Sequence, residues 1–253
     1  MDRDQARVVA NIVAHLAVVA VNAAANIVPL NGQTTGQVSE RFPTLVTPAG
    51  YVFIIWGVIY LFLTGFVVYQ ALPPQRRNPR LRRIGWLFVL NSLANIAWIF
   101  LWHYNIFAAT LVAMFTLLGT LISIYLLLDI GLARVPFIEE WLVNAPFSIY
   151  LAWITVASIA NVAVVLTVFG WDGFGLAPEV WAVALITIAT GIAAAVAWTR
   201  VDLAYVAVIL WSFTGIAARQ AGVQPVVLAS WAGAGAVLAV FLIAAVRRRR
   251  VSA

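Results

Sequence analysis

Apolar residues in this chain occur in long runs, each close to the length that a membrane crossing requires. A helix needs about 20 consecutive apolar residues to cross the hydrocarbon core of a bilayer. Eight segments meet this requirement: 7–29, 49–72, 84–103, 106–129, 141–169, 178–199, 203–219 and 226–246. The sequence therefore predicts an all-α fold, a polytopic membrane helix bundle of about eight transmembrane helices.

Composition agrees with an integral membrane protein and excludes several kinds of chemistry. The chain is 64% hydrophobic and 9% charged, with a mean hydropathy of +1.00. It has no cysteine, which excludes disulfides, thiol catalysis and thiolate metal sites. All 15 basic residues are arginines, so no lysine can form a Schiff base. The net charge of +6 reflects arginines clustered at helix ends, and we expect no nucleic-acid partner.

Two arginine clusters predict the orientation of the chain. One lies in the 75–83 connection, and the other is Arg247 to Arg250 after the last apolar segment. With eight crossings, both clusters and the N-terminus fall on the same side of the membrane. Loops rich in arginine stay in the cytoplasm. We therefore expect cytoplasmic termini, an exterior 30–48 connection, and a bacterial inner membrane as the location.

The first apolar segment carries a stripe of polar residues. Asn11, His15, Asn22 and Asn26 fall within about 60° of one another on a helix. Polar groups facing lipid are costly, so the stripe must face protein, water or a ligand. Hydrogen bonding between helices and the wall of a pocket both remain open. We expect no metal at His15, because no second histidine within the membrane can pair with it.

Three further segments carry rings and amides at helical spacings. The aligned residues are Phe53, Trp56 and Tyr60 in the second segment, Asn91, Asn95, Trp98 and Trp102 in the third, and Tyr150, Trp153, Ala157 and Asn161 in the fifth. Such faces suit a flat, largely apolar ligand with a few polar edges. Packing between helices is the alternative. The other tryptophans are interpreted as anchors at the membrane surface: Trp86, Trp141, Trp171, Trp181, Trp198 and Trp231.

These segments together resemble the TspO/translocator-protein family, also called tryptophan-rich sensory proteins or peripheral benzodiazepine receptors. The family motifs are Pro-Pro-x-x-Val-Phe-x-x-Val-Trp-x-x-Leu-Tyr, Gln-x-x-x-Asn-x-x-Trp and Tyr-Leu-x-Trp-x-x-x-Ala-x-x-x-Asn. The matching residues, in chain order, are Pro48, Val52, Phe53, Trp56, Tyr60, Asn91 (at the Gln position), Asn95, Trp98, Tyr150, Leu151, Trp153, Ala157 and Asn161. The resemblance covers about residues 5–165.

The resemblance implies a five-helix membrane bundle, often dimeric, with a pocket for porphyrins, haem-like tetrapyrroles, sterols or synthetic aromatic ligands. By position, Trp56 and Trp153 match tryptophans of that pocket. Asn95 and Trp98 match pocket residues of the third helix, and Ala157 matches a small residue near the ligand. The resemblance thus places the ligand among the aligned stripes.

The chain also departs from the family pattern. Ala49 stands at the second proline, and the 30–48 connection lacks the usual Trp-Tyr pair and Lys-Pro. Residues 162–170 include no basic residue, which speaks against a cholesterol-type motif and sterol binding. The three helices within about 178–246 have no counterpart in the five-helix family. We therefore expect residues 1–170 to form a ligand-binding core, and residues 171–253 a three-helix membrane extension with an arginine-rich cytoplasmic tail.

The sequence thus predicts a membrane receptor, sensor or carrier for a hydrophobic aromatic ligand, most directly a porphyrin. The predicted ligand-binding residues are Asn11, His15, Phe53, Trp56, Tyr60, Asn91, Asn95, Trp98, Tyr150, Trp153, Ala157 and Asn161. A secondary transporter of a small hydrophobic or amphipathic substrate is the alternative, although the acidic residues are interpreted as helix-end or loop residues.

We expect that the protein is not an enzyme and has no catalytic residues. The family resemblance implies photochemical porphyrin breakdown as a minor alternative. No cofactor is required, and porphyrin or haem would be the ligand. The expected partners are the lipid bilayer and the hydrophobic ligand, and the family adds the option of a homodimer.

Overall fold

The computed structural model describes the backbone of residues 2–252 and the side chains of residues 2–250. Over this part of the chain every regular element is a helix, which confirms the all-α prediction. The elements are α1 (Arg3–Ile27), η1 (Leu30–Gly32), α2 (Thr35–Glu40), η2 (Gly50–Ile54), α3 (Ile55–Ala71), α4 (Pro79–Ile84), α5 (Leu87–His103), α6 (Phe107–Leu127), α7 (Phe137–Glu139), the π-helix η3 (Glu140–Asn144), α8 (Ala145–Val168), η4 (Gly173–Gly175), α9 (Pro178–Arg200), α10 (Leu203–Arg219) and α11 (Gln224–Ser252).

Each of the expected apolar segments coincides with a helix. Six helical stretches are long and apolar enough to cross a membrane: Arg3–Ile27, Gly50–Ala71, Phe107–Leu127, Phe137–Val168, Pro178–Arg200 and Gln224–Arg250. The other two apolar helices, α5 and α10, are shorter, with 17 residues each. At 1.5 Å per residue they extend about 26 Å, a little less than the hydrocarbon core of about 30 Å. Many large apolar side chains on these helices are exposed, as lipid contact requires.

Two short helices, α2 and α4, lie in connections between the apolar segments. α2 begins with a capping box, in which Thr34 accepts from the Gln37 backbone N–H and Gln37 accepts from that of Thr34. α4 begins with Pro79, and the Asn78 side chain accepts from the Arg80 backbone N–H at 2.9 Å. Both signals are readable in the sequence.

The chain packs as two compact units that share α8. The first unit comprises residues 2–41 and 55–154, and the second comprises residues 42–54 with those from Thr155 onward. These boundaries differ from the expected division into residues 1–170 and 171–253. That residues 1–170 act as a separate ligand-binding domain stays a prediction.

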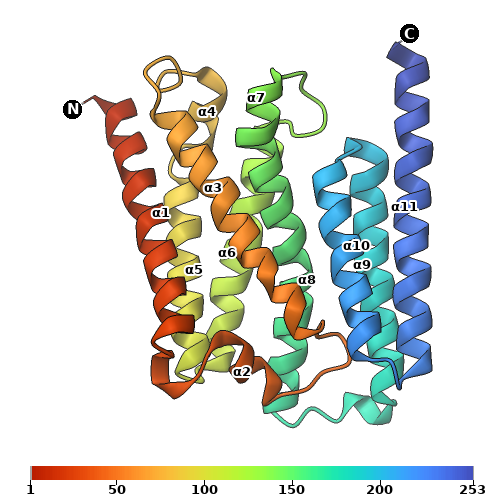
Figure 1. Cartoon of the computed structure of the whole chain (residues 1–253). Coiled ribbons are helices and arrows are strands. Elements are labelled where there is room, and N and C mark those ends of the chain that lie inside the picture. The colour runs from red at the N-terminus through yellow and green to blue at the C-terminus, as the bar shows by residue number, and fades with distance from the viewer. Residues whose placement is uncertain (1, 253) are drawn as a thin grey trace. The chain divides into compact units, whose positions relative to one another are not determined.

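In the first unit, α5 packs against both α1 and α6, and α1 also packs against α3 (Figure 1). Three phenylalanines form the apolar centre near the α3–α5–α8 meeting point. The ring of Phe66 lies 5.3 Å from that of Phe88 and 4.9 Å from that of Phe147. All three are at most 2% exposed. Burying such rings fixes which faces of these helices point inward.

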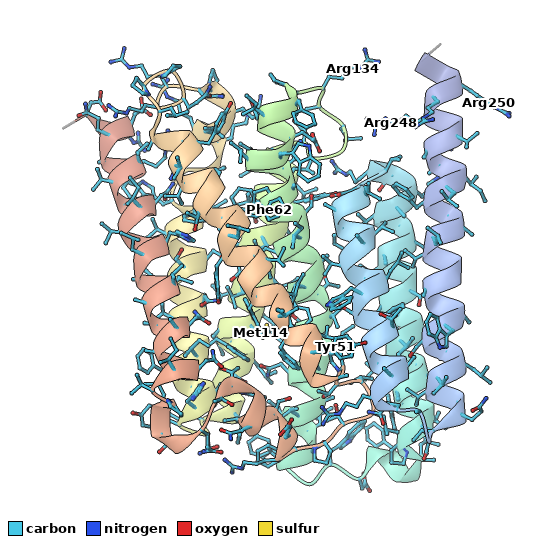
Figure 2. All side chains as sticks on the ribbon, in the orientation of Figure 1. Tyr51, Phe62, Met114, Arg134, Arg248 and Arg250 are labelled. Atoms are coloured by element: carbon cyan, nitrogen blue, oxygen red, sulfur yellow. The ribbon has the colours of Figure 1, made fainter. Side chains whose placement is uncertain are left out.

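In the second unit, α11 packs against α9 and α10 (Figure 1). Gly233 permits this approach, because a Cβ there would lie 2.5 Å from the Thr190 Oγ1. The guanidinium of Arg247 lies 5.1 Å from the Trp198 ring, and Arg248 donates to the Arg200 carbonyl. The arginine-rich end of α11 thus adjoins the C-terminal end of α9, with Arg248 and Arg250 at that end (Figure 2).

Residues 42–54 belong to the second unit because α10 holds them. The Ala49 backbone N–H donates to the Gly215 carbonyl at 3.0 Å, and Trp211 Nε1 donates to the Val52 carbonyl at 3.3 Å. The Tyr51 ring, labelled in Figure 2, packs edge-on against Trp211 at 5.3 Å. Two residues of the first family motif, Pro48 and Val52, therefore serve a packing role against α10.

Candidate functional site

Aromatic rings from the second and fifth apolar segments meet within the first unit. Trp56 stacks on Tyr60, one turn further along α3, with ring centres 5.7 Å apart. The Trp56 ring also meets Tyr150 and Trp153 of α8 edge-on, each at 6.0 Å. Tyr150 and Trp153 are each 2% exposed, whereas Trp56 is half-buried. The predicted stripes on these two helices thus face each other.

Amide side chains from two more helices border these rings. Asn95 Nδ2 on α5 donates to the Tyr150 hydroxyl at 3.0 Å, and Asn22 Nδ2 on α1 donates to Asn95 Oδ1 at 2.8 Å. The Tyr60 hydroxyl lies near Asn95 and Tyr150 but completes a hydrogen bond to neither. An unsatisfied buried hydroxyl is costly, and a polar edge of a ligand or a water would satisfy it.

We call Trp56, Tyr60, Asn95, Tyr150 and Trp153 the indole–amide cluster. Every member comes from the predicted set of ligand-binding residues, and the members lie on three different helices of one unit. The cluster combines broad apolar rings with amide and hydroxyl groups at one side. That combination can hold a flat molecule by stacking while hydrogen bonds orient its polar rim.

The polar stripe of α1 turns towards protein. Asn11 Nδ2 donates to Gln70 Oε1 at 2.9 Å, and His15 Nε2 lies 2.8 Å from Thr64 Oγ1. Asn11 and His15 are at most 3% exposed. These contacts join α1 to α3, as the first of the two open interpretations expects. They leave Asn11 Oδ1 and Gln70 Nε2 without hydrogen-bond partners among the described residues.

The residues aligned on the third segment divide between different neighbours. Asn91 Nδ2 donates to Thr120 Oγ1 on α6 at 2.8 Å, away from the Asn95–Tyr150 contact. Trp98 stacks on Trp102 with ring centres 5.2 Å apart. Of this stripe, Asn95 is the residue that contacts Tyr150 of the indole–amide cluster.

Three further predicted residues fall in the second unit. Phe53 lies in the 42–54 segment, while Ala157 and Asn161 lie in the part of α8 beyond Ile154. Ligand binding by these three residues stays a prediction.

A buried ionic network near the start of α8 was missed by reasoning from the sequence. Arg80 of α4 donates to Glu139 Oε1 and to Asn144 Oδ1, both at 2.6 Å, and also to the Leu128 carbonyl. Glu139 stands at the end of α7, as a helix-end residue, but it is only 6% exposed. The network closes over the π-helix η3, and its contacts indicate a structural role.

One comparison with known proteins gives a match over most of the chain. A family model described as TSPO-like protein matches residues 8–244. The match runs past residue 165, where the motif resemblance ends, and extends into α9, α10 and α11. No curated protein and no solved structure was found to match. The chain is thus an integral membrane protein whose family points to ligand binding or transport. It belongs to the TSPO-like protein family.

Proposed function

We propose that this protein is a membrane receptor, sensor or carrier that binds a porphyrin or related flat aromatic molecule at the indole–amide cluster. The observation that carries the proposal is the meeting of Trp56 with Trp153 and Tyr150, beside the Asn95 amide. Membership of the TSPO-like family supports a ligand-binding role. The proposal assigns the protein no catalytic residue.

The geometry suggests how a ligand enters the cluster. The rings of Trp56 and Trp153 contact each other directly, so a ligand must replace ring–ring contact with ring–ligand contact. Trp153 is buried and held by its surroundings, whereas Trp56 is half-buried. Trp56 is therefore the ring that turns aside. The Tyr60 hydroxyl and the Asn95 amide then face the polar rim of the ligand.

A titration of the purified protein with protoporphyrin and with haem tests this proposal. Binding at the cluster brings the macrocycle against indole, so tryptophan emission should fall and the Soret band should shift together. Both signals should saturate at one ligand per protein chain. Empty detergent micelles with the same ligands are the control. Signals that rise without saturation, as they do in empty micelles, would contradict the proposal.

We also propose that both termini are cytoplasmic, from the arginine clusters at residues 75–83 and 247–250. Fusions of a periplasm-dependent and a cytoplasm-dependent reporter to the C-terminus test this orientation. Activity of the cytoplasmic reporter alone is expected. Activity of the periplasmic reporter alone would reverse the proposed orientation.

Carriage of a ligand across the membrane is the second candidate, and one observation favours it. Polar pairs join α1 to its neighbours at successive levels: Asn11 with Gln70, His15 with Thr64, and Asn22 with Asn95. Such a ladder can serve a partly polar substrate on its way through the bundle. Uptake of protoporphyrin into vesicles containing the protein separates carriage from sensing, because a sensor binds the ligand without accumulating it.

A further inference from the structure

A cavity lies in the second unit, and none of its lining residues belongs to the indole–amide cluster. Its volume is about 370 Å³, within the range of small-molecule sites, about 300–1,000 Å³. Its walls come from the last turns of α8, the first turns of α9 and residues 43–46. Side chains such as Leu166, Leu176 and Leu185 make the wall mostly apolar. The cavity adjoins the N-terminal end of α9, the opposite end of that helix from the α11 arginines.

Aromatic rings form one wall of this cavity. Trp171 and Trp181 both line it, and their rings meet edge-on at 4.9 Å. Phe174 packs against both, at 5.5 Å from Trp171 and 6.3 Å from Trp181. Trp181 is held in place by its Nε1 donating to the Gly173 carbonyl at 2.9 Å. The sequence interpretation takes these two tryptophans as membrane-surface anchors. In the structure they form the aromatic wall of the cavity.

The loop that carries this wall has an unusual backbone. Gly173, Phe174 and Gly175 have φ angles of 67°, 55° and 74°, so all three lie in the left-handed region. A phenylalanine is seldom found there, and such strained residues gather at binding sites. Phe174 is also 78% exposed, although its ring contacts those of Trp171 and Trp181.

A carboxylate stands beside the aromatic wall. Among the lining residues Asp172 alone carries a charge. One of its oxygens accepts from the Phe174 backbone N–H at 3.0 Å. No arginine or histidine nitrogen lies within ion-pair distance of it among the described residues. The second oxygen is thus available to a positive group, and the rings beside it attract cations too.

We propose that this cavity binds a small organic amine with an apolar or aromatic body. The body occupies the space between α8 and α9, and the ammonium group lies against Asp172 and the aromatic wall. An anionic ligand is disfavoured, because Asp172 is the one charge that it would meet. The cavity shares no lining residue with the indole–amide cluster, and the proposal does not depend on porphyrin binding there.

Calorimetric titration of the full-length protein in lipid nanodiscs tests the proposal with three probes of one shape. These probes are phenylbutylamine, phenylbutanol and phenylbutyrate, which are respectively cationic, neutral and anionic at neutral pH. The amine should bind most tightly and the acid least. Raising the salt concentration should weaken binding of the amine and leave binding of the alcohol unchanged. Nanodiscs without protein correct for partition of each probe into lipid.

Matched variants locate the binding. Asp172→Asn removes the charge, while its amide oxygen can still accept from the Phe174 N–H. The affinity for the amine should then fall about two- to fivefold, the size of a partly exposed ion pair, with no change for the alcohol. Glu179→Gln removes a nearby charge of α9 that does not line the cavity, and it should change neither affinity. Ala163→Trp places an indole inside the cavity and should weaken the binding of both.

Two results would overturn the proposal. Equal affinities for amine and alcohol, unchanged in Asp172→Asn, would show a crevice that takes any apolar molecule, including lipid. Unchanged amine binding in Ala163→Trp would place the binding elsewhere. The Asp172→Asn result stands even if the larger substitution prevents folding, because its side chain keeps the size and the backbone contact of the original.

Discussion

The contact between α10 and the 48–52 segment leads to a prediction about Gly215. A Cβ at Gly215 would lie 2.2 Å from Val52 Cγ2 and 3.3 Å from Pro48 Cβ. Ordinary contact at this kind of site needs about 3.4–4 Å, so Gly215→Ala forces a shift of more than 1 Å. Neither neighbour yields easily, since valine is stiff at χ1 and proline is fixed in its ring. The substitution should therefore destabilise the protein.

The size of the effect follows from two opposing terms. Overpacking a close contact typically costs about 1–3 kcal/mol. Replacing a helical glycine with alanine gains up to about 1 kcal/mol of helix propensity. Gly191 of α9 supplies the matched control, because a Cβ there meets nothing within 4 Å. Gly191→Ala therefore reports the propensity gain alone, and the difference between the variants isolates the overpacking cost of about 1–3 kcal/mol.

Thermal unfolding in detergent, followed by circular dichroism, measures both variants. The midpoint of Gly215→Ala should lie roughly 2–12 °C below that of Gly191→Ala, at about 2–4 °C per kcal/mol for a chain of this size. Adding Val52→Ala removes the methyl groups in the way. The double variant Val52→Ala with Gly215→Ala should then lose less unfolding free energy than the two single variants lose together. Equal midpoints for both glycine variants, with additive behaviour of the pair, would refute the contact.

The remaining predictions concern buried polar groups of the first unit. Asn95→Leu removes hydrogen bonds to α1 and to α8 and should lower the unfolding free energy by about 1–2 kcal/mol in detergent. Asn26→Leu should cost less, because the Asn26 amide donates to Asn22 of its own helix. Arg80→Met leaves the buried Glu139 unpaired and should cost about 3–5 kcal/mol, with partial recovery when Glu139→Gln is added. Arg83→Met breaks an exposed pair and should cost at most about 1 kcal/mol. Equal costs for Arg80→Met and Arg83→Met would contradict the structural role of the buried network.

Helical periodicity predicted much of the indole–amide cluster. The spacing of Trp56 and Tyr60, and that of Tyr150 and Trp153, places each pair on one helical face. The structure brings these faces together in the first unit. Periodicity shows which residues of one helix share a face, because that depends on the helix alone. It does not say which neighbouring helix each residue of a broad face will meet.

The third segment shows this limit. Asn91 and Asn95 stand one turn apart, yet Asn91 bonds to α6 while Asn95 bonds to α1 and α8. Where a helix has neighbours on several sides, its rotation about its own axis decides which neighbour each of its polar residues meets. The partners Gln70 and Thr64 of α3 were likewise missed, since neither residue belongs to an aligned stripe.

The cavity of the second unit could not be found from spacing. Trp171 and Trp181 lie on either side of the α8–α9 connection, and a tryptophan near the end of a membrane helix is typical of a surface anchor. What joins their rings is the turn at Gly173, whose carbonyl binds the Trp181 indole. The positive φ angles of three successive residues are a property of the folded loop. In the sequence, the two glycines are the one sign of such a conformation.

The affinity for protoporphyrin of the Trp56 and Trp153 variants tests the central claim most directly. Losing an indole removes a stacking contribution of about 0.5–1.5 kcal/mol, and the lost buried area adds about 2 kcal/mol. Trp56→Ala and Trp153→Ala should each weaken binding by about ten- to several-hundred-fold, and replacement by Phe should weaken it far less. Trp231→Ala, at an exposed position of α11, should leave the affinity unchanged. Unaltered binding in both the Trp56 and Trp153 variants, or a dominant loss in Trp231→Ala, would contradict a ligand site at the indole–amide cluster.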